Sequence, residues 1–193
     1  MLKHILLSGS LILILGVTLP ARADSITYTA ILSGTNEVPP HVVAGSGTAT
    51  FTLTGDSLFI DLSFTGLTGP PAAGHIHCCA ATGTNAPVAV PFVGLPGGTS
   101  GTYTNTVDLT LASTYTAAFI TASGGTAAGA ETALIAALNS GLTYANLHTA
   151  EFPGGEIRGQ IAGQVPEPGS LFLLGTGLVG VVETLRRRAK TIL

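Results

Sequence analysis

The chain has 193 residues, and its composition excludes several classes of protein before any motif is considered. Only 9% of the side chains are charged and 46% are apolar, so the sequence is not of the disordered type, which is charge-rich and poor in apolar residues. Between residues 24 and 164, eight acidic residues stand against a single basic one, Arg158. A domain this acidic, without a lysine, is not expected to bind nucleic acid.

The first 23 residues have the pattern of a signal peptide. Lys3 gives a positive start, an apolar run follows at 5–19, and Ala21 and Ala23 form the small-x-small site that signal peptidase cleaves. The apolar run is shorter than the roughly 18 to 20 residues that a membrane-spanning helix needs. The sequence therefore predicts an exported protein from which signal peptidase removes this segment.

Residues 24–164 are expected to form a mainly β domain. Threonine alternates with apolar residues at 26–30, a period of two that is typical of half-buried strands. The same alternation continues on both sides of a Gly55-Asp56 turn, which predicts a hairpin over residues 48–64. Further strands are expected at 74–78, 88–93, 103–111, 115–121, 142–149 and 155–161.

One short helix is expected within this β domain. Residues 131–139 place Leu134, Ile135 and Leu138 on one side, and Gly141 is suited to end a helix in the left-handed conformation. Eight or nine short strands with one helix predict a β-sandwich or a flattened barrel.

Three histidines in strand-like segments form the main candidate for a functional site. Residues i and i+2 of a strand point to the same face, so His75 and His77 are expected to project together. The same alternation places Tyr144, Asn146 and His148 on one face of a later strand. If the two strands are neighbours, three imidazoles converge and leave a fourth coordination position open, a pattern suited to copper or zinc. The alternative is that the histidines only hydrogen-bond the backbone in half-buried positions.

Cys78 and Cys79 follow His77 directly, and three interpretations of this pair stay open. Exported proteins rarely keep free thiols. Adjacent Cα atoms lie about 3.8 Å apart, closer than the roughly 4.4 Å at which ordinary disulfides begin, so a bridge between these two would be a strained ring. The pair is expected to form a vicinal disulfide, to contribute sulfur ligands to a metal or redox site, or to stay free or bond to another chain.

The carboxylates give weaker candidates. Glu156 and Arg158 lie two residues apart in a predicted strand, and an exposed ion pair is the simplest interpretation. Glu37 precedes two prolines in an extended loop and is expected to be solvated. The sequence has no nucleophile elbow, phosphate-binding loop, H-E-x-x-H or dinucleotide fingerprint, so no catalytic residue is assigned and a non-enzymatic protein is favoured.

Residues 165–193 combine three features in a fixed order. A Pro-Glu-Pro sequence, an apolar stretch and a basic cluster are found at Pro166, Glu167, Pro168, residues 171–182, Arg186, Arg187 and Arg188. An apolar helix followed by positive charge is typical of a stop-transfer signal whose basic end stays in the cytoplasm. Because this helix is marginal as a permanent span at about 1.5 Å per residue, it is expected to anchor the precursor in the inner membrane only transiently.

This C-terminal combination resembles the PEP-CTERM sorting signal of Gram-negative bacteria. The resemblance implies that an exosortase cuts near the Pro-Glu-Pro sequence. It also implies that the mature protein reaches the cell surface or the exopolysaccharide matrix, where exopolysaccharide or other surface proteins are its expected partners.

Four motifs of the central domain resemble, in the same order, those of the CHRD domain, a family named for chordin. They lie at residues 32–40 (Leu-Ser-Gly-Thr-Asn-Glu-Val-Pro-Pro), 45–49 (Gly-Ser-Gly-Thr-Ala), 73–77 (Ala-Gly-His-Ile-His) and 146–160, which holds Asn-Leu-His and Gly-Gly-Glu-Ile-Arg-Gly-Gln. The resemblance covers about residues 26–162 and implies an immunoglobulin-like or superoxide-dismutase-like β-sandwich. It also implies that His75, His77 and His148 are the recurrent histidines, while Cys78 and Cys79 stand where the family commonly has a small residue.

Two functions from different classes are consistent with these observations. The first is a non-enzymatic surface or matrix protein whose β-sandwich serves binding, adhesion or assembly, as the sorting signal and the lack of catalytic motifs favour. The second is a copper- or zinc-binding or redox module built on the His-x-His, Cys-Cys and Asn-Leu-His segments. The metal content of the purified central domain distinguishes the two.

Overall fold

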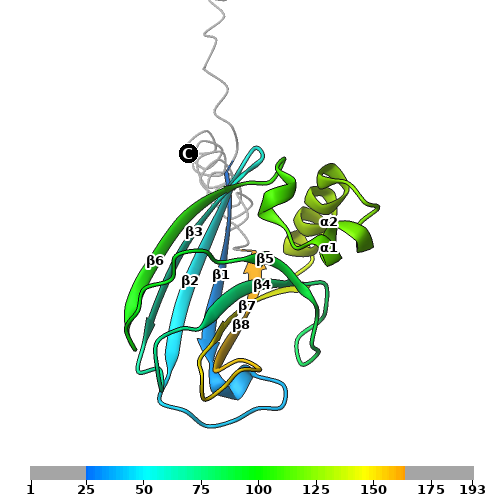
Figure 1. The fold of residues 1–193 in the computed structure, drawn as a ribbon. Coiled ribbons are helices and arrows are strands. Elements are labelled where there is room, and N and C mark those ends of the chain that lie inside the picture. Colours follow the sequence, from blue (N-terminus) through cyan, green and yellow to red (C-terminus); the bar gives the residue numbers. More distant parts are fainter. Residues whose placement is uncertain (1–24, 164–193) are drawn as a thin grey trace, which may run out of the picture.

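A computed structural model describes residues 25–163, which form one eight-stranded antiparallel sheet that is strongly curled (Figure 1). The strands are β1 (Ser25–Ser33), β2 (Ser46–Thr54), β3 (Ser57–Thr65), β4 (Ala73–Cys78), β5 (Val88–Pro91), β6 (Gly101–Asp108), β7 (Thr143–His148) and β8 (Ile157–Gly163). Their order across the sheet is β5-β4-β7-β8-β1-β2-β3-β6. The predicted signal peptide and the predicted sorting-signal helix lie outside the described residues.

The β2–β3 hairpin forms as the alternation predicts. Phe51 lies opposite Ile60, and both side chains are completely buried in the core. On the outer face, the hydroxyl groups of Thr48 and Ser63 are 3.0 Å apart. The turn between the strands uses Gly55 in the left-handed region, with φ +56°, a conformation that glycine adopts without steric cost. This half of the sheet thus buries apolar side chains on one face and exposes short polar side chains on the other.

The curl of the sheet brings the segment after one edge strand against the other edge strand. Phe92, which follows β5, stacks on Tyr103 of β6, with ring centroids 5.3 Å apart. The apolar core lies inside the curl and includes Leu32, Phe51, Ile60 and other buried side chains from every strand of the sheet. A register shift between Ile76 and His77 marks an irregularity where β4 pairs with β5, a feature that increases local twist and bending.

The prediction of a mainly β domain is confirmed, but the strands do not divide into the two packed sheets of the expected sandwich. The nine-residue strand β1 pairs with β2 along its whole length and with β8 on its other side. Because β1 joins both halves through backbone hydrogen bonds, the sheet is continuous and covers its core by twisting and curling rather than by stacking.

The predicted strand over residues 115–121 is wrong, because this segment forms the helix α1 (Ala117–Ala122). The hydroxyl of Thr116 accepts a hydrogen bond from the Phe119 N–H and caps the helix, and the Phe119 side chain is buried. Two alanines in the first turn add helix propensity. Capping and tertiary burial therefore override the β-branched residues that suggested a strand.

The predicted helix is present as α2 (Ala127–Asn139), four residues longer at its start than expected. The added turn begins at Thr126, whose hydroxyl accepts a hydrogen bond from the Gly129 N–H. Gly141 follows the helix with φ +65°, as expected for the residue that ends it. Two short 3-10 turns, η1 (Gly34–Asn36) and η2 (Ala112–Thr114), complete the described elements. No helix within residues 25–163 has the length and apolar character needed to cross a membrane.

The part of the sheet formed by β4, β7 and β8 is buried on both faces. Core residues such as Ile76 and Leu147 fill the inner face, and α2 packs against β7 and β8. Two loops, at residues 34–45 and 79–87, lie over the outer face, and the Asn85 side chain joins them by donating to the Val38 carbonyl at 3.2 Å. Several polar side chains of this face, including His77, Asn146 and Arg158, are therefore buried, whereas His75 and His148 are half-buried.

Candidate metal centre

The pairing of β4 with β7 places three histidines on the outer face of the sheet. His75 lies opposite Asn146 and His77 lies opposite Tyr144. His148 pairs with Ala73 and is therefore diagonal to His75 across the two strands. The strands that carry the histidines are thus immediate neighbours, which is the condition that the sequence alone left open.

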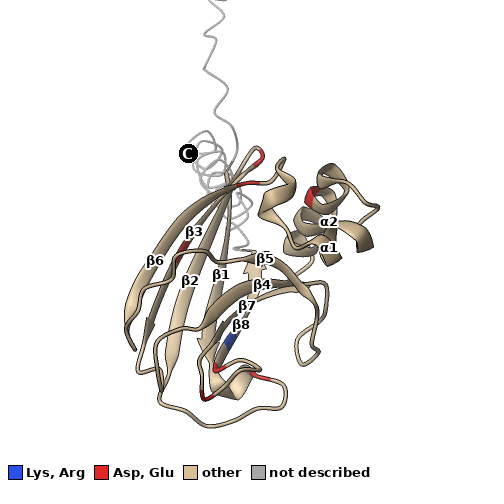
Figure 2. Ribbon diagram, viewed as in Figure 1, with Lys and Arg blue, Asp and Glu red and all other residues tan. Residues whose placement is uncertain are grey.

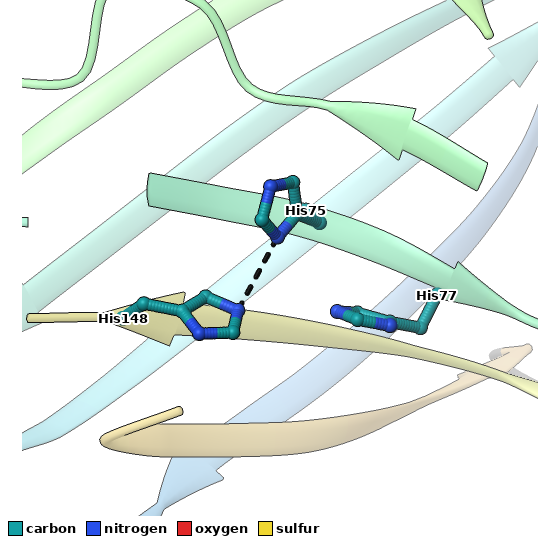
Figure 3. A group of neighbouring side chains, drawn as sticks. All are labelled: His75, His77 and His148. Atoms are coloured by element: carbon teal, nitrogen blue, oxygen red, sulfur yellow. Dashed lines mark hydrogen bonds between the residues drawn. The ribbon is translucent and has the colours of Figure 1, made fainter. Parts of the chain in front are cut away.

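The three side chains approach closely enough to share one ion. One ring nitrogen from each of His75, His77 and His148 lies within 4.8 Å of the others. His75 Nδ1 is 3.2 Å from His148 Nε2. Figure 3 shows the rings of His77 and His148 extending toward each other with His75 beside the gap between them. Two nitrogens bound to one ion at about 2.0 to 2.1 Å lie at most about 4.2 Å apart, so the His75–His148 pair already fits and a small side-chain movement brings all three nitrogens to a common ion.

Backbone carbonyls fix the orientation of two of these rings. His77 Nδ1 donates to the Ala86 carbonyl at 2.8 Å, and His148 Nδ1 donates to the Pro153 carbonyl at 2.9 Å. Because a carbonyl only accepts, each Nδ1 carries the proton and each Nε2 keeps its lone pair. His77 Nε2 is buried and has no hydrogen-bond partner within the described structure. His77 thus has the arrangement typical of histidine ligands in metal sites, with one nitrogen held by an acceptor and the other free for the ion.

The surroundings favour the neutral form of His75 and His77. Burial, together with the nearby His148 and His77, lowers the pKa of His75 to about 4. Burial also lowers the pKa of His77, although its hydrogen bond to the Ala86 carbonyl opposes that effect. Neutral imidazole is the form that binds a metal ion, so at neutral pH these two rings need lose no proton to do so.

Tyr144 supports His77 from the neighbouring strand. The two rings are stacked with centroids 4.5 Å apart and planes 5° from parallel. The Tyr144 hydroxyl accepts a hydrogen bond from the Ala86 N–H at 3.0 Å, so His77 and Tyr144 are bound to the same residue. Arg158 of β8, the strand on the other side of β7, lies with its Cζ 3.4 Å from the centroid of the Tyr144 ring. These contacts hold His77 in one orientation.

The predicted exposed ion pair between Glu156 and Arg158 does not form. Arg158 is only 2% exposed and donates to Asn85 Oδ1 at 2.8 Å and to the Thr84 carbonyl. The sequence interpretation assumed strand alternation through both residues, but β8 begins only at Ile157. The chain turns just before it, so Glu156 and Arg158 do not share a strand face.

Glu156 is a buried structural carboxylate. It accepts hydrogen bonds from the Thr68 N–H at 2.8 Å, the Thr68 hydroxyl at 2.7 Å and the Thr149 hydroxyl at 2.6 Å. Its backbone carbonyl accepts from His41 Nε2 at 3.0 Å, and the His41 ring stacks on Phe152. These bonds fix the loop that follows His148, and His41 lies outside the histidine cluster.

Glu37 is buried, which corrects the expectation that it is solvated. Its side chain is 6% exposed and Oε1 accepts a hydrogen bond from Asn146 Nδ2 at 2.8 Å. Burial raises the pKa of Glu37 to about 7, although the charge on Arg158 and the bond from Asn146 oppose this effect. Loop 34–45 thus adds a carboxyl group to the same polar face that carries the histidines.

Cys78 and Cys79 are joined by a disulfide. Cys78 is buried in the apolar core, on the opposite face of β4 from His77. Within residues 25–163, the group with metal-binding spacing contains the three histidines and neither sulfur. Of the three interpretations of the cysteine pair, the geometry therefore favours the bridge.

Three parts of the site were not predicted from the sequence. They are the carbonyls of Ala86 and Pro153 and the buried position of Arg158. Backbone acceptors carry no residue-type signal, and both come from loops whose positions depend on tertiary folding. Arg158 had a signal, because it is the one lysine or arginine in residues 25–163 and alternates with apolar strand residues.

Comparison with family descriptions gives two matches. The CHRD domain matches residues 28–161, which span the sheet from β1 to β8 and include all three histidines. The PEP-CTERM protein-sorting motif matches residues 164–189. Comparisons with curated proteins and with solved structures gave no match.

Proposed function

The chain belongs to the CHRD domain family, and from this premise we propose that it is a surface protein whose CHRD domain binds a transition metal ion through His75, His77 and His148. The PEP-CTERM motif implies an exported protein that an exosortase processes. The proposal adds that the CHRD domain of this exported protein binds a metal ion.

The observation that carries the proposal is the buried, unpartnered Nε2 of His77. Leaving a buried polar atom without a partner costs about 1 to 3 kcal/mol. His75 and His148 offer nitrogens within 4.8 Å, so an ion between the three rings satisfies this lone pair and takes the place of the hydrogen bond between His75 Nδ1 and His148 Nε2.

The donor set favours copper or zinc. Three neutral imidazoles suit these ions, whereas magnesium and calcium prefer oxygen ligands. Three protein ligands leave a position for water or another small ligand, and the proposal assigns no reaction to it.

We also propose how the protein matures and where the mature domain is located. Signal peptidase removes residues 1–23, the C-terminal segment anchors the precursor in the inner membrane, and exosortase cuts near Pro166. The domain 24–164 is then released to the cell surface or the exopolysaccharide matrix. Intact-mass measurement of the surface protein tests this, because recovery of the full 193-residue chain would contradict it.

Metal content tests the central claim. Mature protein isolated without chelator is analysed by elemental mass spectrometry, and stripped protein is titrated with Zn²⁺ and Cu²⁺ by calorimetry. One bound ion per chain is expected. Absence of binding above the level of a variant in which His75, His77 and His148 are all alanine would overturn the proposal.

A further inference from the structure

A cavity of about 410 Å³ lies apart from the histidine cluster, over the outer face of β8. It is lined by loop residues, including Asn36, Val38 and Thr82, and by Glu37, Arg158 and Gln160. Its volume falls in the range of sites for small molecules. His75, His77 and His148 do not line it.

Arg158 lines this cavity and gives it a positive charge. It is the one lysine or arginine within the described residues, as the single blue segment on β8 in Figure 2 shows. Its side chain is nearly completely buried. A guanidinium has five N–H donors, and Asn85 and Thr84 accept two of them. No carboxylate of the described residues forms an ion pair with it. A buried charge without a carboxylate partner is costly, so the remaining donors favour an anionic group.

Glu37 lines the same cavity. It is 6% exposed, and Asn146 binds its Oε1 from the sheet side. Glu37 and Arg158 interact through their charges but do not form a direct ion pair. The cavity therefore presents a buried carboxyl group, which accepts hydrogen bonds when ionised, and a buried guanidinium, which only donates them.

We propose that this cavity binds a small carboxylate that carries an N–H or O–H donor close to the carboxylate group, as α-amino acids, α-hydroxy acids and hexuronic acids do. The carboxylate pairs with Arg158, since the planar guanidinium fork matches carboxylate geometry. The neighbouring donor bonds to Glu37. A simple carboxylate leaves Glu37 without that bond, and a neutral sugar leaves the remaining donors of Arg158 without an anionic partner.

Calorimetric titration of the mature protein with five probes tests the inference. Glycine, glycolate and glucuronate have both groups, acetate has only the carboxylate, and glucose has only the hydroxyls. At least one of the first three is expected to bind about tenfold or more tighter than acetate and glucose, a difference of about 1.4 kcal/mol. Which of the three binds best identifies the source of the ligand. Equal affinity for all five probes, or no binding of any, would overturn the inference.

Variants separate the cavity from the rest of the protein. Arg158→Gln is expected to abolish binding of the preferred probe, and Glu37→Gln to weaken it about tenfold. Because Arg158→Gln also removes buried hydrogen bonds, it can destabilise the fold. Thr82→Phe is therefore a second variant, which fills the cavity from an exposed loop position. Asp61→Asn, an exposed change on β3, is the matched control and leaves binding unchanged. Unchanged affinity in Thr82→Phe would also contradict the inference.

Binding of the preferred probe is expected not to depend on the metal site. Probe binding is expected to be the same in chelator-treated protein and in the triple histidine variant. Binding that required a metal would place the probe at the open coordination position of the histidine cluster and would refute the separate cavity site.

Discussion

The guanidinium of Arg158 lies over the ring of Tyr144, with its Cζ 3.4 Å from the ring centroid. Contacts of this kind between a cation and an aromatic face contribute from about 0.5 kcal/mol at exposed sites to about 2 kcal/mol when desolvated. Here both partners are buried, and Tyr144 also stacks on His77. The single arginine of the described domain thus stabilises the residue that orients a proposed metal ligand.

Tyr144 is expected to affect both stability and metal affinity. Tyr144→Phe keeps the ring stack but loses the hydroxyl bond to the Ala86 N–H, so we expect a loss of about 0.5 to 1.5 kcal/mol in the free energy of unfolding with little change in metal affinity. Tyr144→Leu also removes the stack and is expected to weaken metal binding about tenfold. Urea denaturation and calorimetric metal titration measure the two effects. Equal metal affinity in the two variants would show that the stack does not position His77.

His75 and His148 are expected to contribute directly to metal binding. Replacing either by alanine removes one of three ligands, so each variant is expected to bind zinc or copper at least about tenfold more weakly. His41→Ala provides a histidine control outside the cluster. Because His41 stacks on Phe152 and bonds to the Glu156 carbonyl, that control is expected to lower stability while leaving metal affinity unchanged. A loss of affinity in the control equal to that in His75→Ala would argue for unspecific binding.

The cysteine pair is expected not to contribute ligands. The double variant Cys78→Ser and Cys79→Ser is predicted to keep the metal affinity of the parent protein within about twofold, because the metal-spaced group comprises only histidines. Metal titration under oxidising conditions checks this. If the double variant keeps its fold by circular dichroism but loses tenfold or more in metal affinity, the cysteine sulfurs contribute to metal binding after all.

The parts of the fold set by local pattern were predictable. The β2–β3 hairpin follows from period-two alternation, and the shared face of His75 and His77 follows from their spacing. The helix α1 was not predictable from the same rule, because the burial of Phe119 depends on how α1 packs against α2 and β5.

The sequence pattern also could not predict that the outer face of β4, β7 and β8 is covered. Whether β1 ends one sheet or joins two halves depends on its pairing with β8, more than a hundred residues away. The burial of Glu37 depends on where loop 34–45 lies over Asn146. Alternation states which residues share a face of a strand, but it does not state what covers that face.

The buried Glu37 is expected to make stability depend on pH. Its folded-state pKa of about 7 lies above the ordinary value of 4.5, so the folded protein holds a proton that the unfolded chain has released between these values. This group's contribution is therefore fully present below about pH 4.5 and is lost as the pH rises through 7. The loss amounts to about 1 to 3 kcal/mol. Glu37→Gln cannot ionise yet keeps an amide oxygen for Asn146, so the difference in unfolding free energy between parent and variant isolates this group from the histidines. Urea denaturation of metal-free protein at pH 5 and pH 8 is expected to show the variant gaining stability relative to the parent at the higher pH. A difference that stays constant across this range would mean that Glu37 is ionised throughout.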